Sequence, residues 1–205
     1  MEAFEHVCKV ALQSEGFVVT SNLKFYVRRR TKKKAYAEHQ THGYEVDLVG
    51  VRKDRLVLAE VKSFFGSRGV HRQSFRGLAD EGKKTDFGGY KLLNDAELRA
   101  SVVNEAASQF GFNVKEVEMR LYVGKFAKGH EEPIKAHFAN FSDPPVEVLS
   151  LDAIMEAVIR AAEIGTYTDD PVVVAVKALK AAGRIRIDDQ GNADAARASR
   201  LREAK

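Results

Sequence analysis

The sequence has a single cysteine and no long apolar run, and both absences narrow the class of protein. Cys8 is the one cysteine among 205 residues, so the chain cannot form an internal disulfide. This excludes a disulfide scaffold and a cysteine-rich zinc site, and it favours a reducing compartment. No run of about 18 apolar residues occurs, so we expect no membrane-spanning helix. The acid-containing N-terminal segment does not resemble a secretory signal, and we expect a cytoplasmic protein with no membrane partner.

Charge is distributed unevenly along the chain, although the net charge is only +4. Residues 1–100 hold 19 Lys and Arg against 13 Asp and Glu, whereas the remainder holds 14 against 16. Seven of the eleven residues from 24 to 34 are basic. Such a segment indicates a polyanionic partner, with nucleic acid first and an anionic membrane surface second. A solvated surface loop would have the same composition.

Apolar residues make up 44% of the sequence and charged residues 30%, which suits a folded domain and excludes disorder of the whole chain. Apolar periodicity predicts helices at 3–14, 91–110, 151–163 and 171–182. Runs rich in β-branched and aromatic residues predict strands at 17–20, 23–28, 117–127 and 146–149, and a pair of strands within 44–62. Aperiodic segments predict loops at 29–42 and 63–90, and the tail 192–205 is either a solvated helix or frayed. The order of these elements predicts an α/β fold, with helices covering a mixed sheet.

We expect a core domain at residues 1–145. Residues 146–205 would form a C-terminal helical extension, unless they belong to the same domain. The negative charge balance of the second half of the chain argues against a primary contact with nucleic acid there.

The pair of strands within 44–62 carries the acids of the candidate site. If its charged turn at 53–54 is a two-residue loop, Asp47 lies opposite Glu60. By the same register, Glu45 lies opposite Lys62. Side chains alternate between faces along a strand, so all four would emerge on one face of the sheet. A three-residue loop would instead put Asp47 on the other face.

Apolar residues cover both faces of these two strands, which predicts that the acids are poorly solvated. Two opposed carboxylates repel each other unless a proton, basic neighbours or a hard cation offsets their charge. Mg²⁺ prefers oxygen ligands and is typically held by one or two carboxylates, water and substrate phosphates. Lys62 points to the same place, where it could position a water molecule or stabilise charge on a phosphate. The alternative is a surface salt-bridge ladder, in which Glu45 pairs with Lys62 and Asp47 pairs with an arginine.

The spacing of these residues resembles the signature of the PD-(D/E)xK nuclease superfamily. Twelve residues separate Asp47 from the tripeptide Glu60-Val61-Lys62, and the first acid lies in EVD where the family often has PD. Upstream, Phe4-Glu5 and the segment EGFVV at 15–19 resemble the opening of archaeal Holliday-junction resolvases and related restriction-endonuclease-like proteins. The resemblance covers about residues 1–125. It implies a three-layer α/β/α restriction-endonuclease-like fold with a central mixed sheet and additional C-terminal helices.

The resemblance also implies a role for each matching residue. Asp47 and Glu60 would ligate Mg²⁺ together with the backbone carbonyl of Val61, and Mn²⁺ would be able to substitute. Lys62 would orient or activate the attacking water. Glu5 would hold a second metal ion or a water ligand. A site of this kind hydrolyses phosphodiester bonds to leave a 5′-phosphate and a 3′-hydroxyl.

Basic residues outside the acid cluster are expected to hold the phosphate backbone, which gives affinity and salt dependence without sequence selection. In the first basic stretch these residues are Lys24, Arg28, Arg29, Arg30, Lys32, Lys33 and Lys34. In the glycine-rich segment that follows the hairpin they are Arg68, Arg72, Arg76, Lys83 and Lys84.

The sequence therefore predicts a Mg²⁺-dependent DNA endonuclease of repair, recombination or restriction, which would be nucleoid-associated when on DNA. Its partner would be duplex or branched DNA. A homodimer or a place in a larger complex is expected, because cutting both strands usually takes two active sites. Two alternatives stay open. One is a non-catalytic nucleic-acid-binding or assembly subunit of the same fold, and the other is a nuclease that acts on RNA.

Several further residues are weaker candidates. His39 and His42 have an H-x-x-H spacing that occurs in metal sites, but we interpret them as part of a loop. His71 is expected to touch phosphate, and Cys8 to be buried and inert. The aromatic residues that could stack on bases are Tyr26, Tyr36 and Phe75. Gln73 is a loose candidate for the glutamine that some members of the superfamily carry after the lysine.

Overall fold

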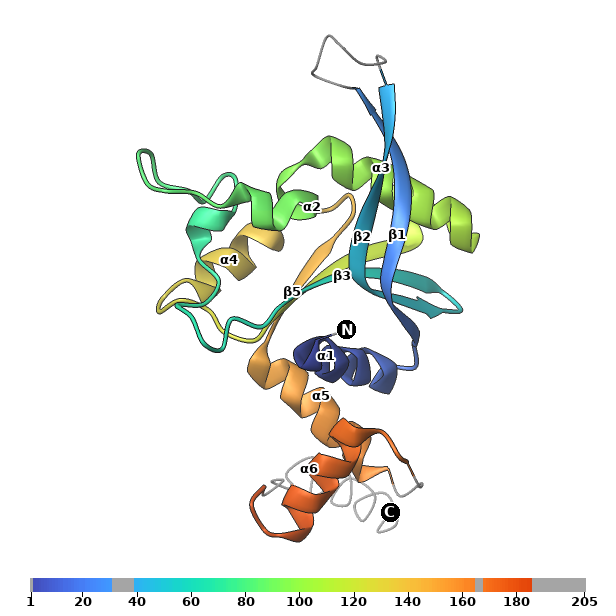
Figure 1. Cartoon of the computed structure of the whole chain (residues 1–205), viewed down its shortest axis with the longest axis vertical. Coiled ribbons are helices and arrows are strands. Elements are labelled where there is room, and N and C mark those ends of the chain that lie inside the picture. The colour runs from blue at the N-terminus through green and yellow to red at the C-terminus, as the bar shows by residue number, and fades with distance from the viewer. Residues whose placement is uncertain (1, 31–38, 165–167, 186–205) are drawn as a thin grey trace, which may run out of the picture.

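The computed structural model describes residues 2–30, 39–164 and 168–185 of the chain. A five-stranded sheet lies at its centre, with the strand order β1-β2-β3-β4-β5 (Figure 1). The strands are β1 (Val18–Arg30), β2 (His39–Arg52), β3 (Arg55–Lys62), β4 (Val117–Val123) and β5 (Val146–Ser150). Strands β1, β2 and β3 are antiparallel, whereas β4 and β5 run parallel to β3. The sheet is therefore mixed.

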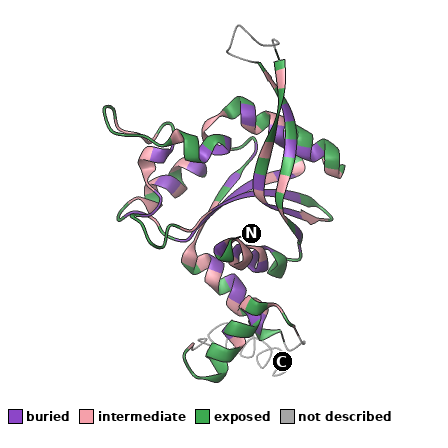
Figure 2. Ribbon diagram, viewed as in Figure 1, coloured by how far each residue is buried: buried purple, intermediate pink, exposed green. Residues whose placement is uncertain are grey.

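Helices cover both faces of this sheet, so that the described part of the protein has three layers (Figure 1). One face is packed by α2 (Lys91–Asn94), α3 (Ala96–Phe110) and α4 (Glu131–Phe138). The other face is packed by α1 (Ala3–Ser14) and α5 (Leu151–Glu163), with α6 (Pro171–Ala181) against α5. A separate buried apolar cluster fills each interface (Figure 2). The α/β class with helices on both sides of a mixed sheet is confirmed.

None of the helices in the described ranges is both long and apolar enough to cross a membrane. The helix expected at 3–14 is present, and it begins with a capping box. Glu2 is its N-cap, and the Oε2 atom of Glu5 accepts a hydrogen bond from the Glu2 N–H at 3.1 Å. The apolar side of the helix, with Phe4, Cys8 and Leu12, is buried against the sheet. This packing holds the N-terminal end of α1 near Asp47 of β2 and the end of β3.

A long ribbon of β1 and β2 replaces the two short strands and the loop that the sequence predicts between residues 17 and 42. Strand β1 continues to Arg30, which pairs with His39 at the start of β2. The predicted strand at 23–28 lies within β1, whereas the paired residues 29–30 and 39–42 are exposed or half-buried and so have no apolar alternation to mark them. Phe25 and Val27 are buried, while the residues beside them in β1 are exposed. Residues 31–38 lie outside the described ranges.

The helix predicted at 91–110 is divided at Asp95. The Asp95 carboxylate accepts a hydrogen bond from the Leu98 N–H at 2.9 Å, so this residue caps a new helix, α3. The segment 63–90, predicted to be a loop, contains two short 3-10 turns and buries Val70 and Phe75 in the core. Helix α4 has no counterpart among the predicted helices, because its eight residues are too few for a clear apolar period.

The described residues after 145 are joined to the sheet and to α1. Strand β5 pairs with β4, and α5 lies along α1. Helices α5 and α6 match the helices predicted at 151–163 and 171–182. Asp170 caps α6 and also lies 2.9 Å from the Nε2 atom of His6 in α1. The boundary expected after residue 145 thus falls directly before a strand of the main sheet, and the tail 192–205 lies outside the described ranges.

The segment that leaves β3 docks on the segment that leaves β4. The Val70 N–H donates to the Lys125 carbonyl at 2.8 Å, and the Ala127 N–H donates to the Val70 carbonyl at 3.0 Å. Gly69 lies at this contact with a φ of +91°, and a Cβ there would come within 2.6 Å of the Phe126 carbonyl carbon. A glycine at this position therefore fixes the path of the chain soon after Lys62.

Replacement of Gly69 by alanine should destabilise the protein through both backbone conformation and crowding. We expect Gly69→Ala to lower the free energy of unfolding by about 2–4 kcal/mol. Gly82→Ala is the matched control, because Gly82 has a φ of +73° but nothing within 4 Å of its Cβ position. It should cost about 1–2 kcal/mol from the backbone alone. Denaturant unfolding measures both variants, and equal losses would contradict the close contact at Gly69.

Candidate active site

Strands β2 and β3 carry Asp47 and Glu60, and the two strands separate next to these residues. The two-residue turn is confirmed, because Arg52 pairs with Arg55 and the β2–β3 ladder continues to the pair of Leu48 and Ala59. Beyond that pair β2 stays with β1, while β3 stays with β4. The expected extension of the ladder to Asp47 and Glu60 is therefore wrong, because β2 and β3 diverge beyond Leu48. Asp47 lies at the fork between the two strands.

Asp47 bridges this fork through its side chain. Its Oδ2 atom accepts a hydrogen bond from the Val61 N–H at 2.7 Å, which links β2 to β3 just past the last backbone pair. Burial raises the pKa of Asp47, while the Val61 N–H and the charge of Lys62 oppose that rise. The expectation that Asp47 lies near the E-V-K tripeptide holds, although Asp47 is joined to its middle residue.

Glu45 does not face Lys62, contrary to the expected register. It pairs with Lys24 of β1, and its carboxylate lies 3.5 Å from the Lys24 Nζ atom at the surface. The salt-bridge ladder of Glu45 with Lys62 is therefore wrong. The Nζ atom of Lys62 lies 3.9 Å from the Oε2 atom of Glu60 instead.

Glu60 is buried, with 5% of its surface exposed. The Tyr44 hydroxyl donates a hydrogen bond to its Oε1 atom at 3.0 Å. No hydrogen-bond donor in the described part of the chain reaches its Oε2 atom, which is also buried. Burial raises the pKa of Glu60 to about 7, against the opposing charge of Lys62 and with the support of the charge on Asp47. One oxygen of this carboxylate thus has a cation 3.9 Å away but no hydrogen bond, which is a costly state in a protein interior.

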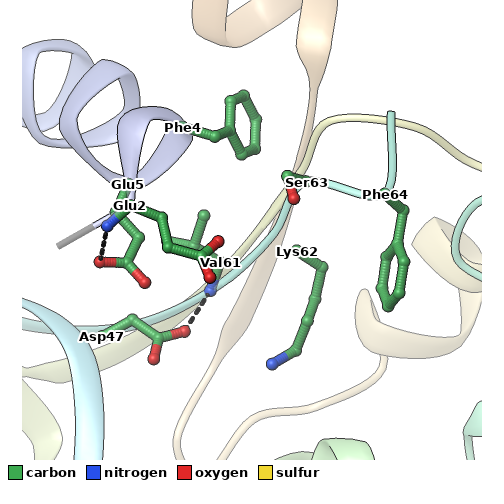
Figure 3. A pocket seen from close by; sticks show the side chains of 8 residues that line it. All are labelled: Glu2, Phe4, Glu5, Asp47, Val61, Lys62, Ser63 and Phe64. Atoms are coloured by element: carbon green, nitrogen blue, oxygen red, sulfur yellow. Dashed lines mark hydrogen bonds between the residues drawn. The ribbon is translucent and has the colours of Figure 1, made fainter. Parts of the chain in front are cut away.

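Lys62 connects the buried acid to an open pocket. Its side chain is 23% exposed, and its ammonium lies 5.5 Å from the centre of the Tyr90 ring. A pocket of about 280 Å³ opens beside it. The residues around this pocket are Glu2, Phe4, Glu5, Asp47, Val61, Lys62, Ser63 and Phe64 (Figure 3). The lysine and the carboxylates of α1 and β2 therefore face a common space.

Glu5 lies at the edge of this pocket but is not joined to the other two acids. Its carboxylate accepts the hydrogen bond from the Glu2 N–H that caps α1 (Figure 3). In residues 2–30, 39–164 and 168–185, no three or more His, Cys, Asp or Glu side chains come close enough together to hold a metal ion. The carboxylates of Asp47 and Glu60 are the pair that the fold brings together.

The basic residues proposed to hold nucleic acid are spread over two regions. Lys24 and Arg28 are exposed on β1, and Arg30 is exposed at the end of that strand. Arg29 forms a salt bridge with Asp95 at 2.7 Å, so its charge is already paired. Lys32, Lys33 and Lys34 lie outside the described residues.

The second basic region is organised by an acid that the sequence analysis does not single out. Asp80 binds Arg72 at 2.6 Å and Lys83 at 2.8 Å. Its backbone and side chain also bond to Gln73, which lies apart from the acid pair and does not serve as a partner of Lys62. Arg68 and Arg76 are exposed, and the Arg76 guanidinium lies over a phenylalanine ring. Lys84 is exposed as well.

The weaker candidates have mixed outcomes. Phe75 is fully buried against Tyr90, so it cannot stack on bases, whereas Tyr26 is exposed and Tyr36 lies outside the described residues. His39 and His42 lie in β2 and not in a loop. The His71 ring packs against the His130 ring at 5.1 Å. Cys8 is buried as expected, and burial raises the pKa of its thiol.

Three residues of the site were not found from the sequence. Glu2 lines the pocket, and its E-x-x-E spacing with Glu5 is a recognisable signal of a capping box. Tyr44 binds Glu60, and Tyr90 lies under Lys62. Neither tyrosine has a local signal, because tertiary packing brings both of them to the site.

The chain is only distantly similar to a protein of known structure. No protein-family model matches it, and no curated protein matches it. A crystal structure of a protein of unknown function, AF1548, aligns with 85% of this chain and 95% of that chain, at 10% identity and a TM-score of 0.36. A likeness this distant carries no argument about the site.

The buried carboxylate of Glu60 predicts an unusual dependence of stability on pH. Its pKa is about 7 in the folded protein and 4.5 ordinarily, so the folded state keeps a proton that the unfolded chain has released between these values. Stability should therefore fall as pH rises through this window. Glu60→Gln removes the ionisation, so we expect it to raise the free energy of unfolding at pH 8 by up to about 3 kcal/mol.

The measurement is thermal unfolding in EDTA at pH 5 and pH 8, with wild type beside Glu60→Gln. At pH 5 the two proteins should be nearly equal, because Glu60 is protonated in the folded state. A Glu60→Gln variant that is less stable than wild type at both pH values would contradict the conclusion that the ionised Glu60 carboxylate destabilises the folded protein.

Proposed function

We propose that the protein is a Mg²⁺-dependent endonuclease that hydrolyses DNA phosphodiester bonds. The observation that carries the proposal is the Oε2 atom of Glu60, which is buried beside Asp47 without a hydrogen-bond donor in the described residues and has the Lys62 ammonium no closer than 3.9 Å. A residue selected for stability alone would not leave a buried carboxylate oxygen without a donor. An ion supplies the missing partner, and a carboxylate pair favours a hard divalent cation.

The residues present fit a small cation with two protein carboxylates. Asp47 and Glu60 would hold Mg²⁺, which typically takes one or two carboxylates and fills its other positions with water and substrate phosphate. The ion would polarise the phosphate and lower the pKa of bound water. Val61 lines the pocket beside Asp47, and its carbonyl is the proposed third protein ligand. Glu5 contributes at the rim of the pocket in this proposal.

Lys62 is placed to act on the phosphate or on the attacking water. Its ammonium is held between the Glu60 carboxylate and the Tyr90 ring, so its position is defined without a short salt bridge. Its partial exposure keeps the charge available to a ligand in the pocket. A lysine in this place would donate a hydrogen bond to a phosphate oxygen or orient a water molecule for attack. The proposed products are a 5′-phosphate and a 3′-hydroxyl.

DNA is the proposed substrate because exposed basic residues lie on a projecting element. The β1–β2 ribbon extends away from the layers of the core (Figure 1) and carries Lys24, Arg28 and Arg30. Backbone contacts of this kind would give salt-dependent affinity without sequence selection. A homodimer, or a place in a larger complex, would supply the second active site needed to cut both strands.

Removal of the first acid should separate cleavage from binding. We expect Asp47→Ala to lower the rate of DNA cleavage in Mg²⁺ by at least roughly 100-fold, a loss in the range seen when one catalytic group is removed. DNA binding should stay near that of wild type or become tighter, since the variant loses a negative charge. Glu45→Ala is the matched control, because Glu45 lies two residues away in the same strand and is paired with Lys24.

The measurement is a cleavage panel of linear, branched and single-stranded DNA, with matched RNA, in Mg²⁺, Mn²⁺ and EDTA. Wild-type cleavage by Asp47→Ala would contradict the proposal. Binding with a steep salt slope and no metal-dependent cleavage of any substrate would instead favour a non-catalytic subunit. Preferential cleavage of the RNA would assign the same site to an RNA nuclease.

A further inference from the structure

A second pocket adjoins the proposed active site and has mostly apolar walls. Its volume is about 380 Å³, and its walls include Val7 of α1, Phe65, and Leu151 and Met155 of α5. It shares Glu2, Phe4 and Ser63 with the pocket that contains Asp47 and Lys62. The two pockets are therefore contiguous, with an ionic side and an apolar side. A volume of this size is in the range of pockets that hold small ligands.

A turn directly after Lys62 and Ser63 presents one aromatic ring to each pocket. Phe64 lines the ionic pocket and Phe65 lines the apolar pocket. Phe64 has a φ of +47°, a conformation that is unfavourable for a bulky side chain. The turn is fixed by hydrogen bonds, since the Ser67 N–H donates to the Phe64 carbonyl at 3.1 Å and the Lys125 Nζ donates to the Ser67 carbonyl at 2.7 Å.

Phe65 is held in place while much of its surface stays open. Its ring packs edge-on against Phe4, with the ring centres 5.0 Å apart. Gly124 leaves room for the ring, because a Cβ there would come within 2.9 Å of it. Phe65 is nevertheless 53% exposed. A strained, hydrogen-bonded turn thus maintains an exposed aromatic surface beside the acid pair, which packing of the core does not require.

We propose that the apolar pocket receives an unstacked nucleobase, from the nucleotide next to the phosphate bound at Asp47 and Lys62. The inference rests on the proposed function, because that function places a phosphate in the adjoining pocket. Phosphate and base of neighbouring positions are covalently joined, so two contiguous pockets of opposite character accept them together. Aromatic and apolar walls suit the face of any base and give little sequence preference.

The proposal specifies the substrate class. A base that is stacked and paired within a duplex cannot enter a side pocket unless it leaves the helix, which costs least at unpaired or mismatched positions. The preferred DNA would therefore carry an unpaired nucleotide at the cleavage point, as in single strands, flaps or mismatched sites.

The test is a binding measurement in EDTA, so that cleavage does not interfere. Fluorescence anisotropy compares a single-stranded oligonucleotide with a strand of the same length whose central nucleotides are abasic. We expect Phe65→Ala to weaken binding of the intact strand by roughly 5- to 100-fold, the range for loss of one base–aromatic stack, and to leave binding of the abasic strand almost unchanged. Met155→Ala, on α5 in the lining of the same pocket, should act in the same direction.

Leu179→Ala is the matched control, because Leu179 is a large apolar residue, 46% exposed on α6, outside both pockets. The proposal is overturned if wild type does not bind the intact strand more tightly than the abasic strand, or if Phe65→Ala weakens both equally. It is also overturned if the sole effect of Phe65→Ala is a loss of self-association, which would assign the pocket to a second copy of the chain.

The outcome is separable from that of the nuclease proposal. If Phe65→Ala weakens binding of the intact strand alone, but the wild-type protein cuts no DNA in Mg²⁺, the base pocket is supported and the endonuclease is contradicted. A protein that cuts DNA in Mg²⁺ but shows no base-dependent loss would overturn the base pocket alone.

Discussion

Burial of the Glu60 carboxylate is the constraint on which the rest of the site depends. The β2–β3 ladder ends at Leu48, which is next to Asp47 in the chain. The Asp47 side chain accepts a hydrogen bond from the Val61 N–H in place of a further backbone pair. Glu60 is turned into the core, where Tyr44 satisfies one oxygen and the other has no donor in the described part of the chain. Burial of two neighbouring acids is unfavourable unless positive charge offsets it, and Lys62, 3.9 Å from Glu60, supplies one positive charge for two acids. The proposal of a cation site follows from this imbalance.

Both helical layers contribute to holding the acids in this state. Helix α1 covers one face of the sheet and brings Glu2 and Glu5 to the rim of the pocket. The opposite layer supplies Tyr90 beneath Lys62. A three-layer fold can therefore keep the carboxylates poorly solvated while one side of the fork stays open to a ligand. The same opening continues into the apolar pocket, so charge and apolar surface meet at one place.

Much of this arrangement could be predicted from local patterns, and the remainder depends on contacts that are distant in sequence. The charged dipeptide at 53–54 and the alternation around it predict the turn and the pairing as far as Leu48. The same alternation fails at Glu45, because β2 leaves β3 beyond Leu48 and Lys24 of β1 becomes the partner of Glu45. Phe25 and Val27 lie in the strand predicted at 23–28, whereas residues 29–30 and 39–42 are exposed or half-buried and have no apolar alternation, which made the end of the ribbon look like a loop. Tyr44 and Tyr90 reach the site through packing, for which the sequence offers no short-range signal.

Calorimetric titration with Mn²⁺ at pH 6 tests the central claim most directly, namely that Asp47 and Glu60 form a cation site. Because the pKa of Glu60 is about 7, the carboxyl group holds a proton at pH 6 in the metal-free protein, and binding of the ion must release it. The account predicts saturable binding whose heat depends on the ionisation enthalpy of the buffer at pH 6. That dependence should fade at pH 8, and Asp47→Asn should abolish the binding. Absence of saturable binding by wild type, or unchanged binding by Asp47→Asn, would contradict the account.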